Sequence, residues 1–220
     1  MNKSEQIKRY LFFVLGLMVL AFGVALSVKA NLGTSPISSL PYVLSLAFPL
    51  TIGQFTILMH IVFILLQIAL LRKDFDWIQL MQLPAAILFG VFTDAAMRLL
   101  SWYAPSSYAE QWICVLLSCV IVAVGVSMEV IANVVMLAGE GMVKAIAQVS
   151  GKEFGKIKIV FDSSLVLIAA GCSLLSLHHI AGVREGTLAA ALTVGMMSRL
   201  FIRKMRPFEK KILRAEPSPK

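Results

Sequence analysis

Residues 11–28 read LFFVLGLMVLAFGVALSV, a run of eighteen positions without a charged side chain. A helix of that length is long enough to cross the hydrocarbon core of a bilayer. Because the run lacks the period-two alternation of a membrane barrel strand, it favours a helix over a strand. Five further, largely apolar runs lie at residues 53–71, 83–102, 112–131, 159–177 and 187–202. The sequence therefore predicts an all-α polytopic membrane protein with six transmembrane helices.

The composition indicates that lipid is the natural solvent of this chain. Of its 220 residues, 59% are hydrophobic and 15% are charged, and the mean hydropathy is +0.85. A water-soluble domain of this size has too little interior to bury so much apolar surface. The basic residues before the first run resemble the start of a signal peptide, but the run is too long for one, so we expect a retained helix. We expect a single membrane domain over residues 1–220.

The basic residues predict the orientation. In a six-helix arrangement with a cytoplasmic amino terminus, 17 of the 20 Lys and Arg residues fall on the cytoplasmic side. Only three fall outside: Lys29, Arg98 and Arg184. This split follows the positive-inside rule and predicts a protein of the cytoplasmic (inner) membrane with both termini in the cytoplasm. Helix ends and a basic cytoplasmic tail at 204–220, resting on anionic headgroups, explain the net charge of +8, and no nucleic acid is needed.

An internal repeat divides the chain into two halves. Residues 21–31 and 123–133 match at an offset of 102, and six of the eleven positions are identical. At the same offset Gly53 falls on Gly155, and both glycines open a long apolar run. We therefore expect repeat one at about residues 10–103 and repeat two at about 111–203. Chance similarity between two helices rich in small residues is the alternative.

Each half has a broken apolar segment after its first helix. Residues 32–50 are interrupted by one glycine and three prolines, and residues 134–149 by two glycines and two charged residues. Three crossings per half place the halves in opposite orientations, which makes an inverted repeat of the kind found in secondary transporters. Irregular backbone at membrane depth is tolerated where protein or a water-filled cavity surrounds it. We expect both segments to be half-helices or re-entrant segments that line a substrate path.

Several motifs resemble one group of bacterial membrane proteins. Residues 31–41 read NLGTSPISSLP, residues 154–162 read FGKIKIVFD, and residues 184–187 read REGT. With these motifs the sequence resembles the YczE/YyaS/YitT group, in its DUF6198-like branch, over nearly the whole chain. The resemblance implies a small polytopic membrane protein. It implies no substrate and no catalytic residue.

Polar residues in and beside the broken segments are the candidates for substrate binding. The first segment has Pro36 near a run of hydroxyl residues, which resembles a helix start whose free amides attract an anion. Glu129 and Asn133 are four apart and would share a helix face; interfacial polar residues are the alternative. Glu140 and Lys144 are also four apart, as an ion pair that opens for substrate or as a structural pair. The candidates are Asn31, Thr34, Ser35, Ser38, Glu129, Asn133, Glu140 and Lys144.

Other charged or titratable residues are candidates for ion coupling or gating. Asp162 could bind a driving proton or cation, or form a plain salt bridge with Lys158. His60 stands at the position equivalent to Asp162 and is either a pH-sensitive group or a packing residue. Arg184 could draw anions toward the outer end of the sixth helix. The candidates are His60, Lys158, Asp162 and Arg184. Within the third span, Asp94 and Arg98 are expected to pair with each other.

The function is predicted partly by exclusion. The sequence has no nucleotide-binding loop, dinucleotide fingerprint or familiar catalytic motif, so we expect no enzyme, no cofactor and no metal site. The leading hypothesis is a secondary transporter or permease for a small polar or anionic metabolite, driven by protons or sodium. The alternatives are a substrate-binding membrane subunit of a larger transporter and a non-transporting scaffold or regulator. The expected partners are the lipid bilayer, a small-molecule substrate and a second copy in a homodimer.

Overall fold

The fold consists of helices. The computed structural model describes residues 3–208, and none of these residues belongs to a β-strand. The elements are α1 (Lys3–Lys29), α2 (Pro36–Ala47), α3 (Ile52–Leu71), η1 (Arg72–Asp74), η2 (Trp77–Met81), α4 (Gln82–Leu99), α5 (Tyr108–Ala132), α6 (Ala138–Ser150), α7 (Phe154–Leu177) and α8 (Glu185–Phe208). The predicted all-α class is confirmed. Most of the tail predicted at 204–220 lies outside the described residues, and its first part is helical because it continues α8.

Within residues 3–208, five helices are long and apolar enough to cross a membrane. They are α1, α3, α4, α5 and α7, and each overlaps a predicted span. The sixth predicted span coincides with α8, which has the necessary length. The second half of α8 carries four basic residues, which lower its apolar character: Arg199, Arg203, Lys204 and Arg206. By length and composition, α8 is therefore not among the helices that could cross a membrane.

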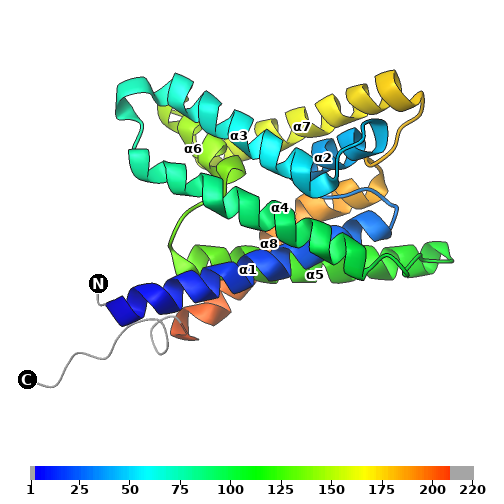
Figure 1. Cartoon of the computed structure of the whole chain (residues 1–220), viewed down its shortest axis with the longest axis horizontal. Helices are drawn as coiled ribbons and strands as arrows, with labels where there is room; N and C mark the ends of the chain where they lie inside the picture. The colour runs from blue at the N-terminus through cyan, green and yellow to red at the C-terminus, as the bar shows by residue number, and fades with distance from the viewer. Residues whose placement is uncertain (1–2, 209–220) are drawn as a thin grey trace, which may run out of the picture.

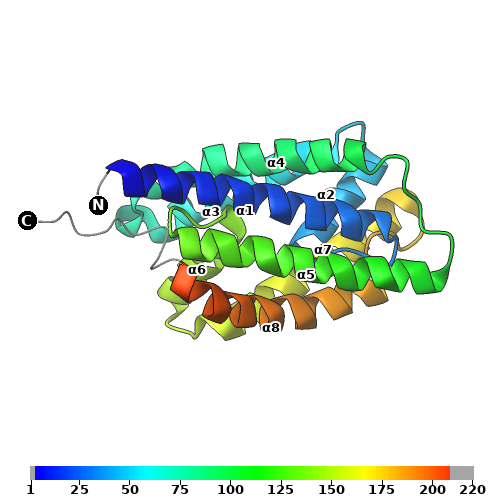
Figure 2. The ribbon, with the colours of Figure 1, turned by 90° about the horizontal axis from the view of Figure 1, so that it is seen from below.

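The helices form two layers (Figures 1 and 2). One layer holds α4, α1, α5 and α8 side by side, each in contact with the next. The other holds α3, α6, α2 and α7, in which the short helices α2 and α6 each pack against both α3 and α7. The antiparallel pair α1 and α5 forms the centre. Of the most apolar stretch of α1, 61% is buried, against 22% of that of α7, so α7 lies at the periphery.

The central helices α1 and α5 make reciprocal contacts. A methyl group on Gly23 of α1 would come within 2.8 Å of Val122 Cγ2 in α5, and one on Gly125 of α5 within 2.8 Å of Leu20 Cβ in α1. Gly23 and Gly125 are 102 residues apart in the sequence, and so are Leu20 and Val122. Such an exchange of equivalent partners is what a twofold axis between two like surfaces produces. The missing side chains let the two backbones approach closely, as small residues do in membrane helix pairs.

The broken segments form short helices that start at equivalent positions. The segments predicted at 32–50 and 134–149 contain α2 and α6, and α6 begins 102 residues after α2. Likewise α7 begins 102 residues after α3. In Figure 1, α2 lies toward one end of the long axis of the molecule and α6 toward the other. Their first turns meet, because Ile37 Cδ1 of α2 occupies the space that a side chain on Gly139 of α6 would need.

The two halves differ at one interface. α3 packs along α4, where Gly53 and Gly90 let each helix approach the backbone carbonyl of the other. α7 and α8 hold the equivalent places, yet within residues 3–208 they make almost no contact with each other. A side chain on Gly171 of α7 or on Gly195 of α8 would accordingly meet nothing within 4 Å.

Candidate functional site

The start of α2 gathers hydroxyl side chains around a proline. Pro36 opens the helix, where its missing N–H costs no hydrogen bond. Ser35 Oγ donates to Ser38 Oγ at 3.0 Å, and Ser39 Oγ donates to the Pro36 carbonyl at 2.7 Å. Ser35 precedes the helix, but its side chain makes no capping hydrogen bond to a first-turn amide. The predicted helix start is therefore present, and its hydroxyls bond to one another and to the backbone.

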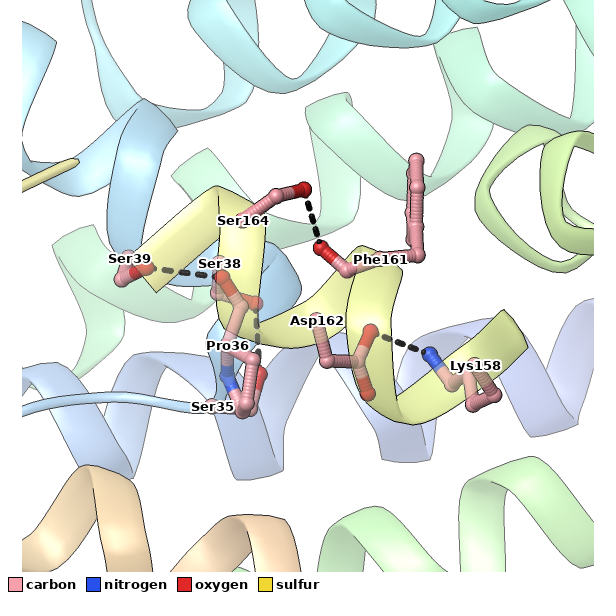
Figure 3. A network of polar contacts seen from close by, with 8 residues as sticks. All are labelled: Ser35, Pro36, Ser38, Ser39, Lys158, Phe161, Asp162 and Ser164. Carbon is pink, nitrogen blue, oxygen red and sulfur yellow. Dashed lines mark hydrogen bonds and ion pairs between the residues drawn. The ribbon is translucent and has the colours of Figure 1, made fainter. Parts of the chain in front are cut away.

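Two charged residues of α7 lie beside this helix start. Lys158 Nζ is 2.7 Å from Asp162 Oδ1, so the salt bridge considered from the sequence is formed. α7 packs along α2, and Figure 3 shows the ion pair in the same neighbourhood as the serines of α2. The structure thus brings together residues from two separate sets of candidates. We call this group the α2–α7 polar cluster; it consists of Ser35, Ser38, Ser39, Lys158 and Asp162.

The second broken segment is arranged differently. Glu140 is half-buried in the first turn of α6 and Lys144 is exposed, and no ion pair joins them in the described part of the chain. Behind the start of α6, Gln67 and Gln82 exchange hydrogen bonds of 3.1 and 3.2 Å. Gln67 also donates to the Ala138 carbonyl at 3.2 Å. Sequence reasoning missed this buried pair, because Gln67 is a single polar residue inside one apolar run and Gln82 directly precedes another.

Two buried polar atoms lack a hydrogen-bond partner among the described residues, His60 Nδ1 and Glu129 Oε1. His60 is 2% exposed, and its ring stacks on Phe63 and Phe89 with centroid distances of 6.3 and 6.1 Å. Glu129 is 9% exposed in α5, and Glu140 is close enough for the two carboxyl groups to repel each other when both are charged. An unpaired charge inside a membrane costs several kcal/mol. Both residues therefore remain candidates for a functional role.

Asn31 and Asn133 follow the ends of α1 and α5. Both have a left-handed backbone, with φ of 55° and 50°, and both are exposed. Asn tolerates this conformation at the end of a helix better than most residues do. Glu129 is buried while Asn133 is exposed, so the two candidates differ in accessibility.

Two arginines bind the carbonyl ends of these helices. Arg9 is 7% exposed, and its Nη1 donates to the Ile131 carbonyl at 3.4 Å and to the Ala132 carbonyl at 3.1 Å, at the end of α5. Arg184 Nη1 donates to the Asn31 carbonyl at 3.1 Å, beyond the end of α1. Each interaction places positive charge at the negative end of a helix dipole. Arg184 thus stabilises a helix end. Sequence reasoning did not single out Arg9, because a basic residue near the start of the chain indicates only the orientation in the membrane.

The loops at the far end of α1 interlock. Thr34 is fully buried where the α1–α2 loop meets the α7–α8 loop, and its amide donates to the Gly182 carbonyl at 3.3 Å. Thr187 Oγ1 accepts a hydrogen bond from the Arg184 amide at 3.4 Å and so helps to start α8. Thr34 was predicted to contact substrate, whereas its surroundings here are those of a packing residue.

Asp94 corrects one prediction. Its carboxylate does not pair with Arg98 along α4 but binds the start of α3 instead. Oδ2 accepts from Thr51 Oγ1 at 2.6 Å, and Oδ1 accepts from the Gly53 amide at 2.8 Å. A carboxylate at a helix amino terminus satisfies free amides and is favoured by the helix dipole. We call Thr51, Gly53 and Asp94 the α3–α4 latch.

Metal sites and grooves add no further candidate. No three His, Cys, Asp or Glu side chains within residues 3–208 are grouped so that they could hold a metal ion. An open groove of about 500 Å³ lies between α1, α4 and α5, and its lining is apolar, including Met18, Phe22 and Phe92. Such a lining suits lipid tails and offers nothing to a polar solute.

Similar sequences occur in other bacterial membrane proteins. A family model described as a "Family of unknown function (DUF6198)" matches residues 7–203. The uncharacterized membrane protein YczE of Bacillus subtilis (strain 168) is 26% identical over 198 residues, which cover 90% of this chain and 86% of that protein. The uncharacterized protein YyaS of the same strain is 31% identical over 65 residues, which cover 30% of this chain and 32% of that protein. No solved structure matches.

Proposed function

The chain belongs to the DUF6198 family, and from this starting point we propose that it is a secondary transporter or permease for a small polar or anionic metabolite. In this proposal six helices, including α8, cross the cytoplasmic membrane, and both termini lie in the cytoplasm. The two halves form an inverted repeat around a central path. Protons or sodium ions drive the transport.

The meeting of α2 and α6 is the observation that carries the proposal. Ile37 and Gly139 touch, and they are equivalent residues of the two halves, so their contact lies where a twofold axis would pass. The reciprocal glycine contacts of α1 and α5 fit the same axis. Because α1 and α5 are antiparallel, an axis that exchanges them runs across the helices and therefore in the membrane plane. Transporters of this type place their binding sites near the midplane, where broken helices begin.

The unequal interfaces of the two halves support alternating access. The latch and the paired glycines hold α3 against α4, whereas α7 and α8 stand apart. In an inverted repeat, opening the α3–α4 interface and closing the α7–α8 interface would open the path toward the opposite side of the membrane. With the orientation set by the basic residues, the latch lies at the outer end of α3 and α4. Within this proposal we interpret the arrangement as a state closed to the outside and open toward the cytoplasm.

We assign ion coupling to Glu129. Its carboxyl group is buried, one of its oxygens has no partner within the described chain, and Glu140 adds a repulsive charge nearby. A proton or a cation bound to Glu129 would remove the cost of this unpaired charge. Uptake and release of that ion would then favour different states of the protein.

The proposal is tested by flux into liposomes. Purified protein is first screened for thermal stabilisation by small polar and anionic metabolites, and each stabilising solute is then assayed for uptake under proton and sodium gradients. We expect at least one solute class to bind and to be taken up. A folded protein that binds none of the solutes and takes up none contradicts transport. That result would favour a non-transporting scaffold or regulator. If an energising partner co-purifies, it would favour a substrate-binding subunit of a larger transporter.

A further inference from the structure

The Lys158–Asp162 ion pair occupies an unusual position. It lies in the second and third turns of α7, one of the five helices apolar enough to span a membrane. The other ion pairs observed within residues 3–208 lie in the first two turns of α1, at the start of α7 or at the start of α8. Ionisable residues inside a span are costly and generally mark the path of a substrate or an ion. The pair is also reachable, because 29% of the Lys158 side chain and 23% of the Asp162 side chain remain exposed.

No third charged residue in the described part of the chain forms an ion pair with Lys158 or Asp162. α7 packs against α2 and α6. α2 has no charged residue, and α6 contributes Glu140 and Lys144, neither of which forms an ion pair with α7 in the described part of the chain. What α2 contributes is its amino-terminal end, which carries partial positive charge and two hydroxyls that now bond to each other, those of Ser35 and Ser38.

We propose that the α2–α7 polar cluster binds the substrate, and that the substrate is a small zwitterion. Lys158 receives its carboxylate, and Asp162 receives its ammonium group. This assignment rests on the proposed transport function and narrows its substrate class. It gives the ion pair a role in recognition, in place of the ion-coupling role considered from the sequence.

The charges of the cluster discriminate against ions that carry one charge. A simple carboxylate that bound Lys158 would leave Asp162 without its partner, and a simple ammonium ion would leave Lys158 without its partner. Separating a partly buried ion pair without replacing both contacts is strongly unfavourable. A zwitterion replaces both contacts at once. The open space between α7 and α8 lets α7 adjust as the pair separates.

The test compares matched probes on the wild-type protein. The probes are the twenty common amino acids, β-alanine and glycine betaine, and for the most stabilising one also its deaminated acid and its decarboxylated amine. We expect at least one zwitterion to raise the melting temperature, and the acid and the amine to bind at least tenfold more weakly. The proposal is overturned if no zwitterion stabilises the protein, or if the acid alone stabilises it as much as the zwitterion does. This arm needs no variant and so remains decisive if a variant does not fold.

Variants then locate the site. K158Q and D162N are each expected to weaken zwitterion binding at least tenfold. The matched controls are K156Q and E153Q, which remove an exposed ion pair in the first turn of the same helix and should leave binding unchanged. Equal binding by K158Q, D162N and the wild type overturns the assignment.

Uptake into liposomes separates this inference from the transport proposal. Uptake of a solute without a positive charge, unaffected by K158Q and D162N, would refute the zwitterion assignment and leave transport standing. Zwitterion binding that depends on both residues, without uptake of any solute, would support the binding site and refute transport.

Discussion

Ile37 in α2 lies against Gly139 in α6, and the two residues are 102 positions apart in the sequence. Contacts between equivalent residues of two repeats fall on the axis that relates the repeats. This contact joins the first turns of the two short helices, which interrupt the apolar spans of each half. The proposed transport path is built around it.

Gly139→Ala should destabilise the protein. The added methyl group would collide with Ile37 Cδ1, and overpacking of this kind costs about 1–3 kcal/mol. The measurement is the melting temperature in detergent, and Ile37→Ala combined with Gly139→Ala should recover part of the loss. Gly171→Ala is the control, because its methyl group meets nothing within 4 Å and should stabilise the helix by up to about 1 kcal/mol. Equal effects of the two glycine substitutions would show that the close contact is not needed.

Asp94→Ala should loosen the α3–α4 latch. Two hydrogen bonds to a carboxylate are lost, and we expect a destabilisation of about 1–3 kcal/mol. In the transport assay the variant should also change the uptake rate, because the closed interface is weakened. Arg98→Gln, at an exposed site one turn further along α4, should stay within about 0.5 kcal/mol of the wild type. If Asp94→Ala changes neither the stability nor the uptake rate, the α3–α4 latch does not hold this interface closed.

Arg9→Gln should destabilise the end of α5. The guanidinium group binds two terminal carbonyls of that helix in a buried place, and its loss should cost about 2 kcal/mol. Chemical denaturation of the purified protein measures this. Lys8→Gln removes the neighbouring positive charge from an exposed position and serves as the control. If both variants lose the same stability, the effect comes from net charge and not from the helix end.

Glu129→Gln should separate folding from coupling. The amide has the shape of the carboxyl group and carries no charge, so the variant should fold as well as the wild type or better. Uptake driven by the ion gradient should be lost, while exchange of substrate across the membrane without a gradient persists. Glu153→Gln, at an exposed position, is the control. Full gradient-driven uptake by Glu129→Gln would assign coupling to another residue.

The helices and the spacing of their starts could be predicted from the sequence, because each depends on local patterns. Apolar runs of sufficient length located the five spanning helices, and Pro36 with its hydroxyl neighbours located the start of α2. The offset of 102, found in one short match, also separates the starts of α2 and α6. Spacing along one chain is enough for features of this kind.

Contacts between helices could not be predicted in the same way. Spacing rules pair residues four apart on one helix, and they paired Asp94 with Arg98 and Glu140 with Lys144. In the structure Asp94 binds free groups at the start of another helix, and Glu140 and Lys144 form no ion pair within the described residues. Which helix end comes within reach of a carboxylate is decided by tertiary packing, and no local pattern carries that information.

The inverted arrangement of the two halves is tested most directly by the sidedness of one pair of equivalent residues. Asp76 follows α3 and His178 follows α7, both are exposed, and they are 102 residues apart. Asp76→Cys and His178→Cys are made separately in a background in which Cys114, Cys119 and Cys172 are replaced, and intact cells are treated with a membrane-impermeant maleimide. The account predicts labelling of His178→Cys in intact cells and of Asp76→Cys only after the membrane is opened. Labelling of both from the same side would contradict the inverted repeat and the transport path built on it.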